Sequence, residues 1–129
     1  MRKVEKEVIG AFVDGKTKRM GNTASILNPI GTLNLMLHGN RIAAMSNRDG
    51  VKKLWVSNAG WPSRTTQSRL NALFSLLDMP ERVYIKGGVQ YLDYWPVGWG
   101  VRRSSPTTIN ISELRKSAVL VAVQQTKTV

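Results

Sequence analysis

Hydrophobic residues near the start of the chain recur with the spacing of an amphipathic helix. Val4, Val8 and Phe12 lie at positions i, i+4 and i+8, and Gly15 stands where such a helix is expected to end. The residues that follow, 16–23, are polar and basic, and we expect them to form a loop. The pattern therefore predicts a short N-terminal helix that packs its apolar face on the rest of the fold.

The next segment has the alternating pattern of a half-buried strand. Leucine occupies every second position of residues 33–37, and the Gly-Asn pair at 39–40 predicts a tight turn into a second strand over 41–45. An Asp-Gly pair at 49–50 is a second turn signal, and it precedes a third strand over 52–57. The middle of the chain is therefore predicted to form three antiparallel strands.

The clearest helix pattern follows this predicted sheet. Its apolar residues stand at positions i, i+3, i+4 and i+7, and they are Leu70, Leu73, Phe74 and Leu77. Thr65 is a candidate N-cap, and Pro80 stops the helix. We expect a helix over residues 66–77 that buries four large side chains, each contributing roughly 1.5–3 kcal/mol.

The last third of the chain predicts a hairpin and then a less regular tail. Strands over 83–85 and 89–95 flank a Gly-Gly pair at 87–88. Residues 96–108 contain several prolines and glycines and are expected to be a looser stretch. For residues 112–125 a capped helix and a strand both fit the pattern, and we favour the helix.

Together these elements predict an α+β fold with an antiparallel sheet of about five strands. The sheet is accompanied by the N-terminal helix, by the central helix over residues 66–77, and by a loosely structured C-terminal tail. We expect residues 1–95 to form a single α+β domain. Residues 96–129 are then a C-terminal extension that packs on the domain or on a partner.

The charge of the chain points to a polyanionic partner. The 19 Lys and Arg residues outnumber the 8 Asp and Glu residues, which gives a formal net charge of +11 and a pI of about 10.6. Such a surplus favours nucleic acid, and among nucleic acids we favour DNA. The chain contains no cysteine, which excludes disulfides, thiolate metal ligands and cysteine nucleophiles.

Candidate catalytic groups are sparse. His38 is the only histidine, so no histidine-based metal cluster can form within one chain, and we interpret it as a structural or exposed residue beside its turn. Asp93 is the only acid in an aromatic setting, and no nucleophile elbow, Walker sequence or dinucleotide fingerprint occurs. We therefore expect a protein that is not an enzyme, with no catalytic residue, metal or cofactor.

The sequence gives no indication of a membrane partner. The basic first residues are followed by Glu5 and Glu7 instead of the apolar segment that a secretory signal requires. The longest apolar run, residues 118–123, is far shorter than the ~20 residues that span a bilayer. We expect no association with a membrane.

Two stretches of the chain carry a resemblance to a group of phage proteins. The first is Leu37-His38-Gly39-Asn40-Arg41-Ile42-Ala43, and the second runs from Asn58 to Leu73 with the pattern AGW-x-x-x-TT-x-x-RLNAL. Across residues 8–95 the chain resembles small proteins encoded by tailed bacteriophages. The resemblance implies a phage origin, and hence a location in the cytoplasm of the infected bacterial host, but it supplies no catalytic residue.

Basic clusters and aromatic residues indicate how a nucleic acid would be held. Cations that contact phosphates release counterions, which gives an affinity that does not depend on sequence and that falls with salt. Trp55 and Tyr84 are expected to point outward, because their neighbours in each strand are apolar, and outward rings beside cations bind single-stranded nucleic acid by stacking. We therefore expect a non-catalytic protein that binds single-stranded DNA. The candidate interface residues are Lys16, Lys18, Arg19, Arg41, Lys52, Lys53, Trp55, Arg64, Arg69, Tyr84, Lys86, Arg102 and Arg103.

Several alternatives stay open at this point. Thr65 and Thr66 either help to bind a phosphate at the start of the helix or only cap it. Trp55 and Tyr84 either face the nucleic acid or fill a second core. The alternative function is a phage protein that binds and modulates a host protein, such as RNA polymerase or a defence factor, or a minor virion component. A homo-oligomer that forms through the aromatic C-terminal region is a further candidate, with Tyr94, Trp95 and Trp99 as its contacts.

Overall fold

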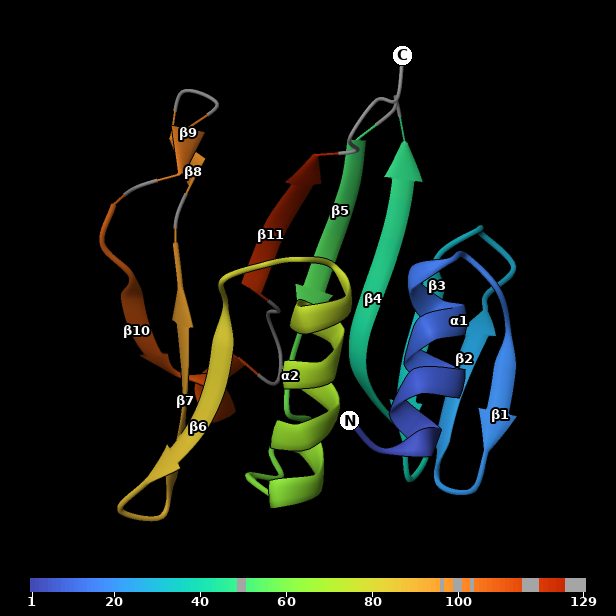
Figure 1. Cartoon of the computed structure of the whole chain (residues 1–129), viewed down its shortest axis with the longest axis horizontal. Coiled ribbons are helices and arrows are strands. Elements are labelled where there is room, and N and C mark those ends of the chain that lie inside the picture. The colour runs from blue at the N-terminus through green and yellow to red at the C-terminus, as the bar shows by residue number, and fades with distance from the viewer. Residues whose placement is uncertain (49–50, 96, 99–100, 103, 115–118, 125–129) are drawn as a thin grey trace.

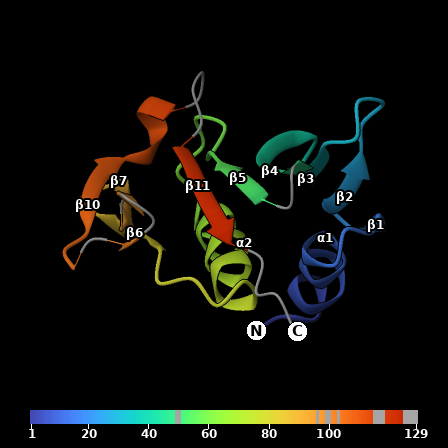
Figure 2. The same cartoon turned by 90° about the horizontal axis from the view of Figure 1, so that it is seen from above.

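A curved antiparallel sheet wraps around two helical segments of this chain (Figures 1 and 2). The computed structural model describes residues 1–48, 51–95, 97–98, 101–102, 104–114 and 119–124. Within these residues the large sheet has the order β1-β2-β3-β4-β5-β11, with antiparallel pairing throughout. Its strands are β1 (Lys18–Met20), β2 (Thr23–Leu27), β3 (Leu33–Leu37), β4 (Asn40–Arg48), β5 (Val51–Val56) and β11 (Val119–Gln124).

A second, smaller sheet lies beside the large one, with the order β10-β7-β6. Its strands are β6 (Arg82–Lys86), β7 (Val89–Tyr94) and β10 (Thr107–Asn110). A two-stranded ribbon of β8 (Val97–Gly98) and β9 (Val101–Arg102) extends from β7. The predicted α+β class with an antiparallel sheet is confirmed, although the described strands divide among a large sheet, a small sheet and the β8–β9 ribbon.

The two helical segments begin and end close to the predicted positions. A turn of π-helix (Glu5–Ile9) continues into α1 (Gly10–Val13), and α2 covers Arg64–Leu76. Most residues that carried the helix patterns are buried, as predicted. Val4, just before the π-helical turn, and Leu77, the C-cap of α2, are partly buried and pack against the core. The N-cap of α2 is Ser63 and not Thr65, because the Ser63 hydroxyl accepts a hydrogen bond of 3.1 Å from the backbone N–H of Thr66.

The turn between β3 and β4 lies one residue earlier than predicted. His38 and Gly39 both have positive φ, of 51° and 77°, which is the geometry of a two-residue hairpin loop whose twist matches the flanking strands. Asn40, expected in the turn, is the first residue of β4. The predicted hairpin is nevertheless confirmed, because β3 and β4 pair antiparallel across this two-residue turn.

Two regions that the sequence pattern describes poorly also form strands. Residues 16–23 were expected to be a loop, but β1 pairs with β2 as a hairpin at the edge of the large sheet. The favoured helix over 112–125 is wrong for the described residues 119–124, which form β11 and pair with β5. A single 3-10 turn (Ile111–Leu114) precedes them. The division at residue 95 stays a prediction, but β10 and β11 beyond it add a strand to each sheet.

The core lies between the inner face of the large sheet, the helices and the small sheet. It includes Leu35 and Leu54 from the sheet, Phe12 from α1 and Leu73 from α2. The side chain of Asn71 joins α2 to β6, because it donates to the carbonyl of Val83 and accepts from the same residue's N–H. Among the described residues, no helix combines the length and apolarity that crossing a membrane requires.

Candidate nucleic-acid interface

The strand register assigns each residue of the large sheet to an inner or an outer face. Ala43 and Met45 pair with Val56 and Leu54, and all four are buried toward the helices. Because neighbouring residues in a strand point to opposite sides, Trp55 lies on the outer face. Figure 2 shows α1 and α2 on the inner side, with no described helix covering the outer face.

Three of the described basic side chains lie on this outer face. Arg19 pairs with Ala24, which pairs with Met36, which pairs with Arg41, so the four residues form a row across β1 to β4. At the usual strand spacing the Cα atoms of Arg19 and Arg41 are about 14 Å apart. Lys53 is two residues from Trp55 on β5 and points to the same side. Arg19, Arg41 and Lys53 are all exposed.

Trp55 belongs to a second row on the same face. It pairs with Ala44, and Ala44 pairs with Asn34. Ala44 faces outward but is only 5% exposed, which shows that larger neighbouring side chains cover it. Trp55 itself is half-buried, so part of its ring packs on neighbouring side chains and part is in contact with solvent. We call Arg19, Arg41, Lys53 and Trp55 the large-sheet face.

The large-sheet face has no acidic neighbour among the described residues. The outward positions of β1 to β5 with described side chains are Arg19, Ala24, Ile26, Asn34, Met36, Arg41, Ala44, Ser46, Lys53 and Trp55. The ion pairs between described side chains, Lys18–Glu7 and Arg69–Glu5, both lie elsewhere. Within the described part of the chain, no carboxylate therefore pairs with the cations of this surface.

The small sheet brings together the other predicted aromatic and its basic neighbours. Tyr84 pairs with Tyr91 on β7, and the two ring centroids are 5.7 Å apart. Arg82 and Lys86 are exposed on the same side of β6. We call Arg82, Tyr84, Lys86 and Tyr91 the small-sheet face. An open pocket of about 460 Å³ lies there.

Asp93 distinguishes the small-sheet face from the larger one. Its Oδ1 accepts hydrogen bonds from the hydroxyl of Tyr84 at 3.1 Å and from the hydroxyl of Thr108 at 2.6 Å. Partial burial raises the pKa of Tyr84, and the Asp93 carboxylate raises it further. A carboxylate thus stands among the cations where a phosphate would have to bind.

Arg69 is not an interface residue, contrary to the prediction. Only 4% of it is exposed, and its Nη1 donates to Glu5 Oε2 at 2.8 Å. Its Nε donates to the hydroxyl of Thr23 at 3.1 Å. Arg69 immediately precedes Leu70 on the buried side of α2, so its guanidinium reaches the interior and is neutralised there by Glu5.

Glu5 is held in its charged form by the groups around it. Burial alone would raise the pKa of Glu5. Hydrogen bonds from the Ser68 hydroxyl, the Arg2 backbone N–H and Arg69 outweigh that effect, so the pKa lies below the ordinary value. The Glu5–Arg69 pair therefore joins the N-terminal helical segment to α2 as a charged, hydrogen-bonded pair.

The remaining predicted residues are scattered. Lys18 is bound to Glu7 at 2.6 Å, and Lys16 is exposed just before β1. Arg64 is exposed as the first residue of α2. The backbone of Lys52 belongs to β5 and that of Arg102 to β9, but their side chains lie outside the described part of the chain, as do Trp99 and Arg103.

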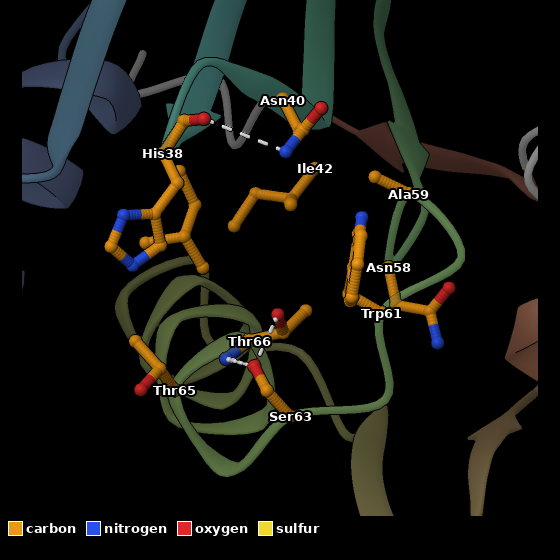
Figure 3. Close-up of a pocket in the computed structure, with 10 residues that line it drawn as sticks. His38, Asn40, Ile42, Asn58, Ala59, Trp61, Ser63, Thr65 and Thr66 are labelled. Carbon is orange, nitrogen blue, oxygen red and sulfur yellow. Dashed lines mark hydrogen bonds between the residues drawn. The ribbon is translucent and has the colours of Figure 1, made fainter.

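A pocket at the end of the large sheet escaped the sequence reasoning. It has a volume of about 350 Å³ and lies between the β3–β4 turn and the segment that leads into α2 (Figure 3). Its lining comes from the two stretches that resembled phage proteins, 37–43 and 58–73. The two distinctive stretches, far apart in the sequence, are the signal from which a shared site could have been predicted.

Comparisons with known proteins place the chain in a family. No curated protein and no solved structure matches it. The sequence model described as Kyanoviridae Gp96 protein matches residues 1–115, which is most of the chain. The chain therefore belongs to the Kyanoviridae Gp96 protein family, a family of phage proteins, and the phage origin expected from its sequence is confirmed at that level.

Proposed function

We propose that this phage protein binds single-stranded nucleic acid, with DNA favoured, through the large-sheet face and without catalysis. The observation that carries the proposal is the combination of three exposed cations and a half-buried tryptophan on a surface with no described acidic residue. Arg19, Arg41 and Lys53 would contact phosphates and release counterions. Trp55 would stack on a base, which is worth about 1–3 kcal/mol.

Single strands fit this surface better than a duplex does. In a duplex the flat faces of the bases are stacked on one another, so an indole on a sheet has no ring face to contact. The row from Arg19 to Arg41 runs across the strands, while Lys53 and Trp55 lie along β5. A flexible chain can follow cations and a ring that are arranged at an angle to one another, whereas a rigid helix cannot.

The test is a triple charge reversal, Arg19→Glu with Arg41→Glu and Lys53→Glu. We expect much weaker binding of a fluorescently labelled oligonucleotide at about 50 mM salt, because three phosphate contacts are lost. The slope of log affinity against log salt should become shallower by about two, since each contact on a single strand contributes about 0.7.

The matched control reverses three exposed cations of the N-terminal segment, Arg2→Glu, Lys3→Glu and Lys6→Glu. Its change in net charge is the same, but these residues do not lie on the outer face of the large sheet. Equal losses in both variants would show that net charge alone drives binding, and the proposed face would be wrong. A parent chain that fails to bind the oligonucleotide would overturn the function, and the host-protein and virion alternatives would take its place.

A further inference from the structure

The pocket at the end of the large sheet is walled by two rings. Figure 3 shows Trp61 on one side and His38 on the other, with the side chain of Ile42 between them, and Leu37 also lines the pocket. Figure 3 shows the indole edge-on, so that one of its flat faces is turned toward the middle of the pocket. Trp61 is 67% exposed, so this ring is not used to fill the core.

The segment that carries Trp61 is firmly held. Asn58 is buried, and its amide donates to the side chains of Gln90 and Ser112 at 3.0 and 2.9 Å and accepts from the N–H of Gly60 at 2.9 Å. Ala59 has a positive φ of 56°, a conformation that costs free energy in a residue with a side chain. The fold therefore stabilises a strained segment that presents an indole to solvent.

His38 is held from the opposite side by a chain of hydrogen bonds. Its Nε2 lies 3.3 Å from the amide nitrogen of Asn22, whose oxygen accepts from the hydroxyl of Thr23 at 2.8 Å. Thr23 in turn accepts from Arg69, the buried partner of Glu5. Because Asn22 donates to Nε2, the ring proton of a neutral His38 is on Nδ1. The exposed imidazole is thus linked through Asn22 and Thr23 to the buried Arg69.

We propose that this pocket binds one unstacked nucleobase of the bound strand, between Trp61 and His38. The proposal rests on the proposed function, since the base belongs to the strand that the large-sheet face holds. A base offers a flat face to the indole and polar edges to the amide of Asn40 and the hydroxyl of Thr65, which also line the pocket. A volume of about 350 Å³ accommodates one heterocycle with its sugar, but not a base pair within a duplex.

The charges next to the pocket suit a nucleotide. Arg41 directly follows Asn40, and Arg64 directly precedes Thr65, and both arginines are exposed. Arg41 also belongs to the row of cations on the outer face of the large sheet. A strand whose phosphates contact Arg41 can therefore place a neighbouring base at the end of the sheet, where the pocket opens.

The experiment uses two probes on the full chain. The first is a set of uncharged deoxynucleosides, followed by NMR shifts of the tryptophan indole and histidine ring signals. The second is the labelled oligonucleotide at several salt concentrations. We expect nucleosides to shift the signals of Trp61 and His38 in the parent and in the Arg19→Glu, Arg41→Glu, Lys53→Glu variant, because a nucleoside carries no phosphate.

Replacing Trp61 separates this proposal from the general function. Trp61→Ala should abolish the nucleoside shifts and weaken oligonucleotide binding by about 5- to 100-fold with an unchanged salt slope, and Trp61→Phe should restore most of both. If the parent binds the oligonucleotide but Trp61→Ala binds equally well, or if nucleosides shift neither ring, the pocket proposal is wrong and the large-sheet face stands. If the parent does not bind the oligonucleotide, both proposals fail.

Discussion

Basic residues on the inner side of the large sheet are ion-paired, whereas the described ones on its outer side are exposed and have no acidic neighbour. On the inner side, Lys18 is bound to Glu7, and Arg69 of α2 is bound to Glu5. On the outer side, Arg19 and Arg41 are exposed among apolar and neutral residues. Lys18 and Arg19 are neighbours in sequence, yet the alternation of the strand sends them to different sides. The net charge gives the excess of cations over anions, but the strand register determines which of the cations face solvent and can contact a partner.

The two sides also differ in what their cations contribute. A buried ion pair such as Glu5–Arg69 gains little net stability, yet removing one partner is costly because the other charge stays in the interior. An exposed, unpaired arginine contributes almost nothing to folding. Substitutions on the inner side should therefore change stability, and substitutions on the outer side should change binding.

The largest effect is expected from Glu5→Gln on the inner side. This variant leaves Arg69 buried without its carboxylate, and the free energy of unfolding should fall by about 3–5 kcal/mol, as measured by urea denaturation. Glu7→Gln is the control, since its ion pair with Lys18 lies at the surface and its loss should leave stability near that of the parent. If both variants unfold at the same urea concentration, the distinction between a buried and an exposed pair is wrong.

The same buried pair should make the stability of the parent chain depend on pH in the acidic range. The pKa of Glu5 is lower in the folded protein than the ordinary value of 4.5, so the folded state favours the carboxylate. Its contribution to stability is complete above pH 4.5 and is lost as the pH falls through the lower pKa of the folded state. Urea midpoints measured from pH 6 downward should decline more steeply for the parent than for Glu5→Gln, and parallel curves would contradict this prediction.

A smaller effect is expected from Trp55→Ala on the outer side. Loss of stacking should weaken oligonucleotide binding by about 1–3 kcal/mol, with no change in the salt slope because no phosphate contact is removed. Trp55→Phe should retain most of the affinity, since a smaller ring still stacks. Equilibrium titrations at three salt concentrations provide the measurement. A changed slope with an unchanged affinity would show that Trp55 is not a stacking residue.

The smallest effect is expected from a substitution that removes the acidic side chain of the small-sheet face, so that this face, like the large-sheet face, has no carboxylate. Asp93→Asn removes the carboxylate from the small-sheet face, and oligonucleotide affinity should rise by about fivefold or less, because one exposed charge is worth about 1 kcal/mol in water. The same change should lower the pKa of Tyr84 toward its ordinary value, which an absorbance titration of the tyrosines at alkaline pH would measure. An unaltered tyrosine titration would show that Asp93 does not act on Tyr84.

Local patterns in the sequence predicted much of the fold. The stripe that includes Leu70 and Leu73 predicted the central helix. Alternating leucines and turn dipeptides predicted the hairpins from β3 to β5, and a Gly-Gly pair predicted the β6–β7 hairpin. Strand β11 was the less favoured of two predictions, because its run of valine, leucine and alanine fits either a helix or a strand, and only its pairing with β5 decides between them. Strand β1 was missed because an edge strand of polar residues has no hydrophobic period.

The candidate site was harder to predict than the fold. Trp55 could be assigned to the outer face from its apolar neighbours alone, Leu54 and Val56. Arg69 could not be excluded from the interface, because its partner Glu5 is 64 residues away in the sequence. The meeting of His38 and Trp61 at one pocket likewise depends on the packing of α2 against the end of the large sheet.

Strand β1 also affects whether two copies of the chain can associate by pairing their sheet edges. It forms one edge of the large sheet, and an open edge offers unpaired backbone groups on which another chain can add a strand. β1 is only three residues long and carries Lys18 and Arg19. A short, charged edge is a poor template for such addition, so we expect the sheet not to extend from one molecule to the next at β1. We therefore expect the charge of Arg19 to disfavour fibril growth at this edge.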